Sequence, residues 1–108
     1  MDINTYQKNT LNTAIYPEAG SGSQGELSYL GLGLVNEAGE VAGKIKKLIR
    51  DNTFEPKKIA DELGDTLWYI ARLADSLGYN LTTILKWNYE KLQNRLENNT
   101  IRGSGDNR

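Results

Sequence analysis

The sequence lacks cysteine and histidine altogether. Without cysteine the chain has no disulfide, no thiolate metal ligand and no thiol nucleophile. Without histidine it lacks the commonest general base and the nitrogen ligand of most zinc sites. Any chemistry must therefore come from carboxylates, lysine, arginine, tyrosine or hydroxyl groups, and a hard metal ion is the cofactor that such oxygen ligands suit.

Strong net charge and long apolar runs are also missing. The formal charge of the 108 residues is −1 at pH 7, so no strong field draws the chain to nucleic acid or to an anionic membrane. No stretch approaches the roughly 18 apolar residues of a membrane span, and the polar N-terminus lacks the apolar run of a signal peptide. We therefore expect a cytoplasmic protein of one domain, with neither nucleic acid nor a membrane as its partner.

Apolar residues recur at spacings of three and four through most of the chain, which predicts an all-α fold. A short helix is expected over 3–15, with Asp2 as its N-cap. A glycine- and serine-rich loop, 18–25, follows; it is either a lid or, as loop statistics favour, a plain connection. Longer helices are expected over 26–50, 56–77 and 81–97.

The ends of these helices carry sequence signals of their own. Pro56 suits a first helical turn, Gly78 a helix C-terminus and Asn80 the N-cap of the last helix. We assign residues 1–97 to one helical domain and 98–108 to a polar C-terminal tail that is ordered only if it docks. Because apolar residues are few for so many helices, we expect a four-helix bundle that is completed by oligomerisation.

Two pairs of carboxylates have the spacing i, i+3, namely Glu37 with Glu40 and Glu62 with Asp65. On a helix this spacing places both groups on one face, where like charges repel. At about 100° per residue, each pair lies at the edge of an apolar stripe rather than opposite it. Helices packed side by side would bring the four carboxylates together on a divalent cation. The alternative is a solvated acidic face, which the favourable i, i+4 order of Glu40 and Lys44 supports.

Each pair also encloses a glycine, Gly39 in the first and Gly64 in the second. A glycine inside a helix costs about 1 kcal/mol relative to alanine. We interpret both glycines as positions that need either close approach of another helix or room for a ligand.

Several polar side chains are candidates for substrate contacts. Lys44, Lys47, Lys91 and Arg95 could bind the phosphates of an anionic substrate, although most surface lysines and arginines serve only solubility. Tyr69 follows the second acidic pair by one turn and could contact a sugar or a base. Asn88 lies near the apolar face of the last helix, where an ordinary satisfied polar residue is equally consistent with the pattern.

Three blocks of the sequence resemble the MazG-like nucleoside triphosphate pyrophosphohydrolases of the all-α NTP pyrophosphatase superfamily. The blocks are Glu37-Ala-Gly-Glu40-Val-Ala-Gly-Lys-Ile-Lys-Lys, Glu62-Leu-Gly-Asp65-Thr-Leu-Trp-Tyr-Ile-Ala-Arg and Asn88-Tyr-Glu-Lys91-Leu-Gln-Asn-Arg95. The C-terminal Gly103-Ser-Gly-Asp-Asn-Arg is also typical of small single-domain members. The resemblance runs from about residue 27 to the C-terminus. Where the family usually reads Glu-Glu-x-x-Glu, this sequence has Asn36 in the first position.

The resemblance implies an enzyme that cleaves ribo- or deoxynucleoside triphosphates between the α- and β-phosphates, giving the monophosphate and pyrophosphate. It implies that magnesium, with manganese as an alternative ion, is held by Glu37, Glu40, Glu62 and Asp65. A metal-activated water would attack the α-phosphorus, and Glu37 or Glu40 would accept its proton.

The resemblance also implies substrate contacts near Tyr69, Asn88 and Lys91. Lys44 and Arg95 are candidates to join Lys91 in stabilising the leaving pyrophosphate. The family further implies homodimers, sometimes paired into homotetramers, with sites near the subunit interface. Because Asn36 replaces a carboxylate, a non-catalytic helical module for nucleotide binding or regulatory interaction stays open as the alternative function.

Overall fold

The computed structural model describes all 108 residues and consists of helices joined by short connections. A short helix α1 (Ile3–Asn9) leads into one 3-10 helix, η1 (Thr10–Thr13). Three long helices follow, α2 (Gln24–Asp51), α3 (Pro56–Ser76) and α4 (Leu81–Glu97). The all-α fold is therefore confirmed, and each long helix begins and ends within two residues of its expected position. No helix is both long enough and apolar enough to cross a membrane.

Side-chain caps mark the starts of α1 and α4, and a glycine marks the end of α3. The Asp2 carboxylate accepts a hydrogen bond from the Thr5 N–H (2.8 Å) at the start of α1. The Asn80 side chain accepts one from the Thr83 N–H (2.8 Å) at the start of α4. Gly78 follows α3 with a φ of +85°, a left-handed conformation that a glycine adopts without strain.

The expectation of one continuous helix over 3–15 was wrong, because the α-helix ends at Asn9. The Thr10 hydroxyl donates to the carbonyl of Gln7 (2.6 Å), and the Thr13 hydroxyl donates to the carbonyl of Thr10 (3.1 Å). Threonine hydroxyls that bond to nearby carbonyls compete with the regular helical ladder. The chain therefore tightens into the 3-10 turn of η1 before it enters the loop.

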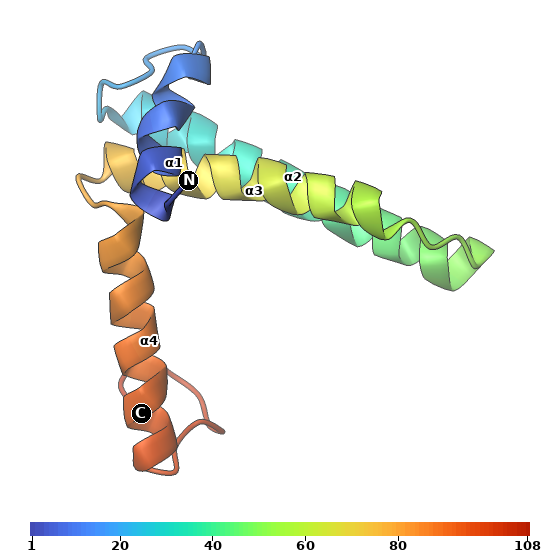
Figure 1. Cartoon of the computed structure of the whole chain (residues 1–108), viewed down its shortest axis with the longest axis vertical. Coiled ribbons are helices and arrows are strands. Elements are labelled where there is room, and N and C mark those ends of the chain that lie inside the picture. The colour runs from blue at the N-terminus through green and yellow to red at the C-terminus, as the bar shows by residue number, and fades with distance from the viewer.

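The helices form an L rather than a closed bundle (Figure 1). α2 and α3 pack along each other as one arm, while α1 lies across α3 and the beginning of α4. α4 leaves the corner in a different direction and forms the second arm. One chain alone therefore does not close a four-helix bundle, and its completion by oligomerisation stays a prediction.

A buried glutamine fixes the corner between the two arms. The Gln7 side chain donates to the carbonyls of Tyr79 (2.9 Å) and Ala71 (3.4 Å) and accepts from the Leu81 N–H (2.7 Å). These bonds join α1 to the end of α3 and to the first residue of α4. The small apolar core lies at the same corner and comprises Ala71, Ala74 and Leu81, with Ile3, Tyr6 and Ile84 packed against them.

A second buried polar residue, Glu26, ties the loop after η1 to α3. Its carboxylate accepts hydrogen bonds from the Tyr16 hydroxyl (2.7 Å), the Gly20 N–H (2.6 Å), the Gly22 N–H (2.9 Å) and the Ser76 hydroxyl (2.8 Å). Burial alone would raise the pKa of Glu26, but these bonds outweigh burial and lower its pKa to about 2. Such anchoring favours a fixed connection over a moving lid.

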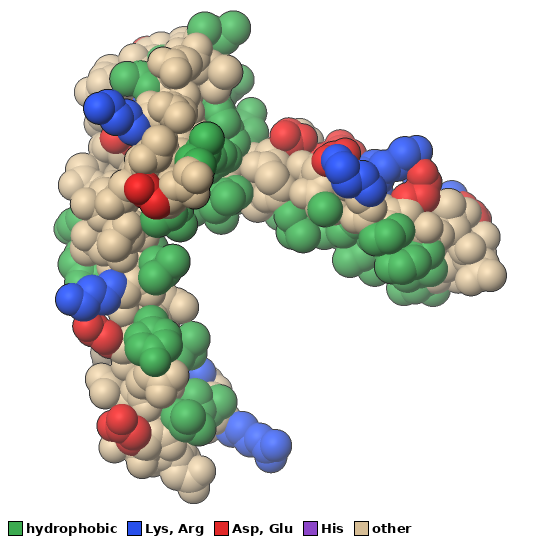
Figure 2. Space-filling model, in the orientation of Figure 1, with side chains coloured by type: hydrophobic (Ala, Val, Ile, Leu, Met, Phe, Trp, Pro, Cys, Tyr) green, Lys and Arg blue, Asp and Glu red, His purple; other side chains and the backbone are tan.

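Much of the apolar surface remains exposed, since only ten of the 108 residues are buried. Figure 2 shows hydrophobic side chains along one edge of the α2–α3 arm and charged side chains along the other. The exposed apolar side chains of α2 and α3 include Leu32, Val35, Ile49, Leu63, Leu67 and Ile70. We name these six residues the apolar edge of the arm.

The C-terminal tail, 98–108, folds back on α4. Arg95 of α4 is buried and donates to the carbonyl of Asp106 (3.1 Å). The Arg108 side chain donates to the carbonyl of Thr100 (3.0 Å), so that the tail closes into a loop. The tail is therefore docked against α4.

Candidate metal centre

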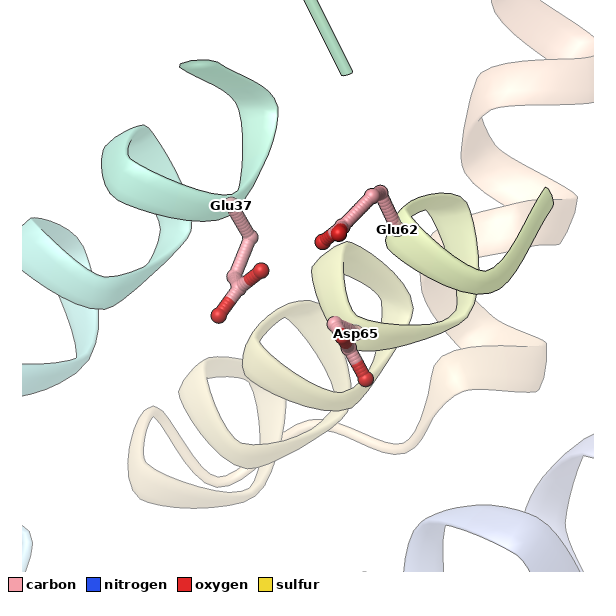
Figure 3. Close-up of side chains that lie close together, drawn as sticks. All are labelled: Glu37, Glu62 and Asp65. Atoms are coloured by element: carbon pink, nitrogen blue, oxygen red, sulfur yellow. The ribbon is translucent and has the colours of Figure 1, made fainter. Parts of the chain in front are cut away.

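Three carboxylates from two helices meet at the border between α2 and α3. Glu37 projects from α2 toward Glu62 and Asp65 of α3 (Figure 3). One oxygen from each of the three lies within 4.8 Å of the others. The i, i+3 spacing places the two α3 residues on one face, and the packing of α2 along α3 brings Glu37 opposite them. The structure thus brings together three of the four predicted metal ligands.

The close approach of these carboxylates has an electrostatic cost. Burial, followed by hydrogen bonding to Glu62 and by the charges of Asp65, Glu62 and Glu40, raises the pKa of Glu37 above its ordinary value. The Lys44 ammonium lies 3.7 Å from a Glu62 oxygen and offsets part of the negative charge. A set of close oxygen ligands with unfavourable mutual repulsion matches the chemistry of a hard divalent cation such as magnesium or manganese.

Glu40, the fourth predicted ligand, lies outside this cluster. It is exposed and follows Glu37 by one turn of α2. Its charge contributes to the raised pKa of Glu37, so the two carboxylates remain neighbours. The roles expected for Glu40, as metal ligand and as proton acceptor, stay predictions.

The glycines inside the acidic pairs lie beside open space. A β-carbon added at Gly39 or at Gly64 would meet no atom within 4 Å. Close approach of another helix within the chain therefore does not explain either glycine. Open space beside the carboxylates leaves the other interpretation, room for a ligand, in place.

Tyr69 lies beside the acidic cluster, as its spacing from Asp65 suggested. Its half-buried ring meets Trp68 edge to face, with 5.0 Å between the ring centroids. Burial, the neighbouring Tyr29 and the charges of Glu37 and Asp65 raise the pKa of the Tyr69 phenol. The phenol is therefore a neutral hydrogen-bonding group next to the carboxylates.

Sequence reasoning missed Tyr6 of α1, which packs against the corner core and is influenced by the charge of Asp65. Burial and then the charge of Asp65 raise the pKa of the Tyr6 phenol. The imperfect apolar stripe of the first helix marked Tyr6 as a packing residue. Its position near Asp65 depends on the docking of α1 at the corner of the L, which no local pattern reports.

The remaining predicted substrate contacts lie on the other arm. Asn88 and Lys91 are exposed on α4, whereas Arg95 is buried under the tail. The carboxylate of Asp106 lies 3.9 Å from the Lys91 ammonium and 3.7 Å from the Arg95 guanidinium. Because α4 runs away from the α2–α3 arm, one chain does not bring these residues to the three carboxylates (Figure 1).

Comparison with known proteins points to one family. Residues 24–100 match the MazG nucleotide pyrophosphohydrolase domain, a span that contains all three long helices. The Gene 37 protein of Mycobacterium phage L5 is 46% identical over 114 aligned positions, which cover the whole of both chains. Its name states no activity. No solved structure gives a significant match.

Proposed function

The chain belongs to the MazG nucleotide pyrophosphohydrolase family, and from this premise we propose that it hydrolyses nucleoside triphosphates to the monophosphate and pyrophosphate. The observation that carries the proposal is the cluster of Glu37, Glu62 and Asp65, whose oxygens lie within 4.8 Å of one another. Such a cluster suits a divalent cation, and triphosphates occur as complexes with such cations. We place the activity in the cytoplasm.

Glu37, Glu62 and Asp65 would hold magnesium, or manganese in its place, and Glu40 would join them through a modest side-chain rearrangement. When bound, such an ion neutralises phosphate charge and lowers the pKa of a coordinated water. Lys44, beside Glu62, would contact the phosphate chain from the same side. Tyr69 would contact the sugar or the base, since its ring lies next to the cluster.

Proton transfer falls to Glu37 or Glu40. Glu40 is exposed and outside the three-carboxylate cluster, so it is free to accept the proton of the attacking water. The water oxygen bonds to the α-phosphorus, and the bond from that phosphorus to the bridging oxygen breaks. The products are the monophosphate and pyrophosphate, with no covalent enzyme intermediate.

A homodimer or homotetramer would complete the site. The apolar edge of the arm is exposed in the single chain, with Leu32 at 74% and Val35 at 70% of full exposure. Burying such side chains stabilises an assembly by about 25 cal/mol per Å² of apolar surface. Asn88, Lys91 and Arg95 of a second chain would then supply the substrate contacts that α4 does not make within its own chain.

The sequence supports a second candidate function, a non-catalytic module that binds nucleotides or regulates a partner. Asn36 stands where the family usually has a carboxylate, so a ligand or base could be missing. Under this alternative the cluster would bind a metal–nucleotide complex without turnover.

Release of pyrophosphate from a panel of ribo- and deoxynucleoside triphosphates, with and without magnesium, tests the proposal. Glu62→Gln should lower kcat/KM by about 100-fold or more, because a lost metal ligand removes several kcal/mol of transition-state stabilisation. Asp61→Asn is the matched control, since Asp61 is the exposed neighbour of Glu62 and pairs with Lys57. Nucleotide binding without pyrophosphate release from any substrate would favour the non-catalytic module.

A further inference from the structure

A second cluster of charge, of opposite sign, lies at the tip of the α2–α3 arm. A cavity of about 80 Å³ is lined by Lys44 and Lys47 of α2, by Thr53 and Glu55 of the connection and by Lys58 of α3. No apolar side chain lines this cavity. We name it the lysine pocket.

All three lysines of the pocket lie close enough to influence the Glu55 carboxylate. The Glu55 carboxylate lies 2.6 Å from the Lys58 ammonium. The hydrogen bond from Lys58, followed by the charges of Lys58, Lys44 and Lys47, lowers the pKa of Glu55. One carboxylate therefore already experiences all three ammonium groups. With three cations and one anion the pocket keeps an excess of two positive charges, enough to attract a further anion.

The lysine pocket adjoins the carboxylate cluster through one shared side chain. Lys44 lines the pocket, and its ammonium also lies 3.7 Å from a Glu62 oxygen. An anionic chain that starts at the carboxylate cluster can therefore reach the pocket past a single lysine. The pocket is small, and its lining of ammonium groups and one hydroxyl, with no apolar side chain, suits a phosphate group rather than a nucleoside base.

We propose that the lysine pocket holds the terminal phosphate of the triphosphate, and so binds the pyrophosphate that leaves. This inference rests on the proposed function and deepens it, because it names what recognises the third phosphate. Lys44, Lys47 and Lys58 bind as compact point charges, and the Thr53 hydroxyl adds a donor. A nucleoside mono- or diphosphate held at the carboxylate cluster leaves the pocket unfilled, so the pocket selects triphosphates.

The test compares two double variants that remove the same charge from the same helices. Lys47→Ala with Lys58→Ala strips the pocket, whereas Lys46→Ala with Lys57→Ala removes neighbouring lysines that do not line it. Each variant also loses one exposed ion pair, Lys58–Glu55 in the first and Lys57–Asp61 in the second. The two variants therefore lose the same net charge and the same number of ion pairs. A difference in phosphate binding between them then reports on the pocket itself.

Isothermal calorimetry with inorganic pyrophosphate and magnesium gives the readout. The pocket variant should bind pyrophosphate about 100-fold more weakly than wild type, at about tenfold for each lost charge-assisted contact. The control variant should stay within about threefold of wild type, and binding of a nucleoside monophosphate should be unchanged in both. Equal weakening in the two variants, or no pyrophosphate binding by wild type, would overturn the inference.

Hydrolysis assays on the same proteins separate this inference from the proposed function. An active enzyme whose KM for triphosphate is the same in the pocket and control variants overturns the inference and leaves the function intact. A wild type that binds pyrophosphate through Lys47 and Lys58 but hydrolyses no triphosphate sinks the proposed function, and the pocket then stands as a pyrophosphate site.

Discussion

The ring of Tyr69 lies against the bare α-carbon of Gly33. A β-carbon built at Gly33 would stand 2.1 Å from Tyr69 Cε1, far inside any contact that real atoms make. Gly33 on α2 thus provides the space in which the Tyr69 ring lies between the two helices. A glycine inside a helix can indicate that another helix approaches closely. Gly33 and Tyr69 form such a close approach between α2 and α3.

Gly33→Ala should therefore displace Tyr69. Overpacking typically costs about 1–3 kcal/mol, and we expect a loss of that size in the free energy of unfolding. Gly31→Ala is the control, because a β-carbon there would meet nothing within 4 Å. That change should stabilise the protein by up to about 1 kcal/mol through helix propensity. Urea unfolding of both variants checks the pair, and equal effects would show that Tyr69 is not confined by Gly33.

Glu37→Gln should stabilise the metal-free protein. Burial, and then the neighbouring Glu62 and Asp65, raise the pKa of Glu37. The ionised form is thus disfavoured in the folded state, so stability falls as the pH rises from the ordinary pKa of a glutamate through the raised pKa of Glu37 in the folded state. The variant removes that loss, which we put at about 1 kcal/mol, or a few degrees in Tm.

The metal response of the same variant should be opposite. Added magnesium should raise the Tm of wild type, since a ligand of the folded state stabilises it, and should raise that of Glu37→Gln far less. Calorimetric melts with and without magnesium at neutral pH give both results. A wild type whose Tm ignores magnesium would argue against a metal centre at Glu37.

Glu26→Gln should destabilise the protein in a pH-dependent way. The pKa of Glu26 falls from 4.5 to about 2 on folding, so its contribution is complete above about 4.5 and is lost as the pH drops toward 2. A shift of this size corresponds to about 3 kcal/mol. Urea unfolding at pH 7 and pH 3 should show a large deficit for the variant at pH 7 that narrows at pH 3. Exposed Glu97→Gln should show neither effect.

Val35→Glu should block self-association. Val35 belongs to the apolar edge of the arm and is 70% exposed in the single chain, so a charge there disfavours burial against a second copy. Light scattering coupled to size exclusion should find wild type as a dimer or tetramer and Val35→Glu as a monomer. Val35→Ile, which keeps the surface apolar, should behave as wild type. A monomeric wild type would refute the assembly.

The long helices could be predicted because their signals are local. Pro56, Gly78 and Asn80 each act within one turn of the helix they delimit. The convergence of Glu37 with Glu62 and Asp65 followed from two i, i+3 spacings and the packing of adjacent helices. The sequence also left a solvated acidic face open, so the structure was needed to show that these three carboxylates meet and that Glu40 lies outside their cluster.

The direction of α4 relative to the α2–α3 arm could not be predicted, because contacts between residues far apart in the sequence determine it. The direction of α4 depends on the Gln7 side chain, which forms hydrogen bonds with Ala71 and Leu81. These two residues lie 64 and 74 positions further along the chain. No local pattern marks such a clamp, so the separation of Asn88 and Lys91 from the carboxylates was not foreseen. Glu26 did carry a readable signal, since Ser23-x-x-Glu26 is a capping-box pattern, and the Ser23 hydroxyl does cap the Glu26 N–H at 3.1 Å.

The hydrogen bonds to Glu26 also bear on amide hydrogen exchange in the loop before α2. The amide protons of Gly20 and Gly22 point at a buried carboxylate, although they belong to a glycine- and serine-rich stretch that would ordinarily exchange with solvent at once. The same carboxylate also accepts a hydrogen bond from the Ser76 hydroxyl at the end of α3, so it links both loop amides to that helix. We therefore expect the loop, the α2 N-terminus and the α3 C-terminus to open together, so that amide exchange at Gly20 and Gly22 reports the stability of this region.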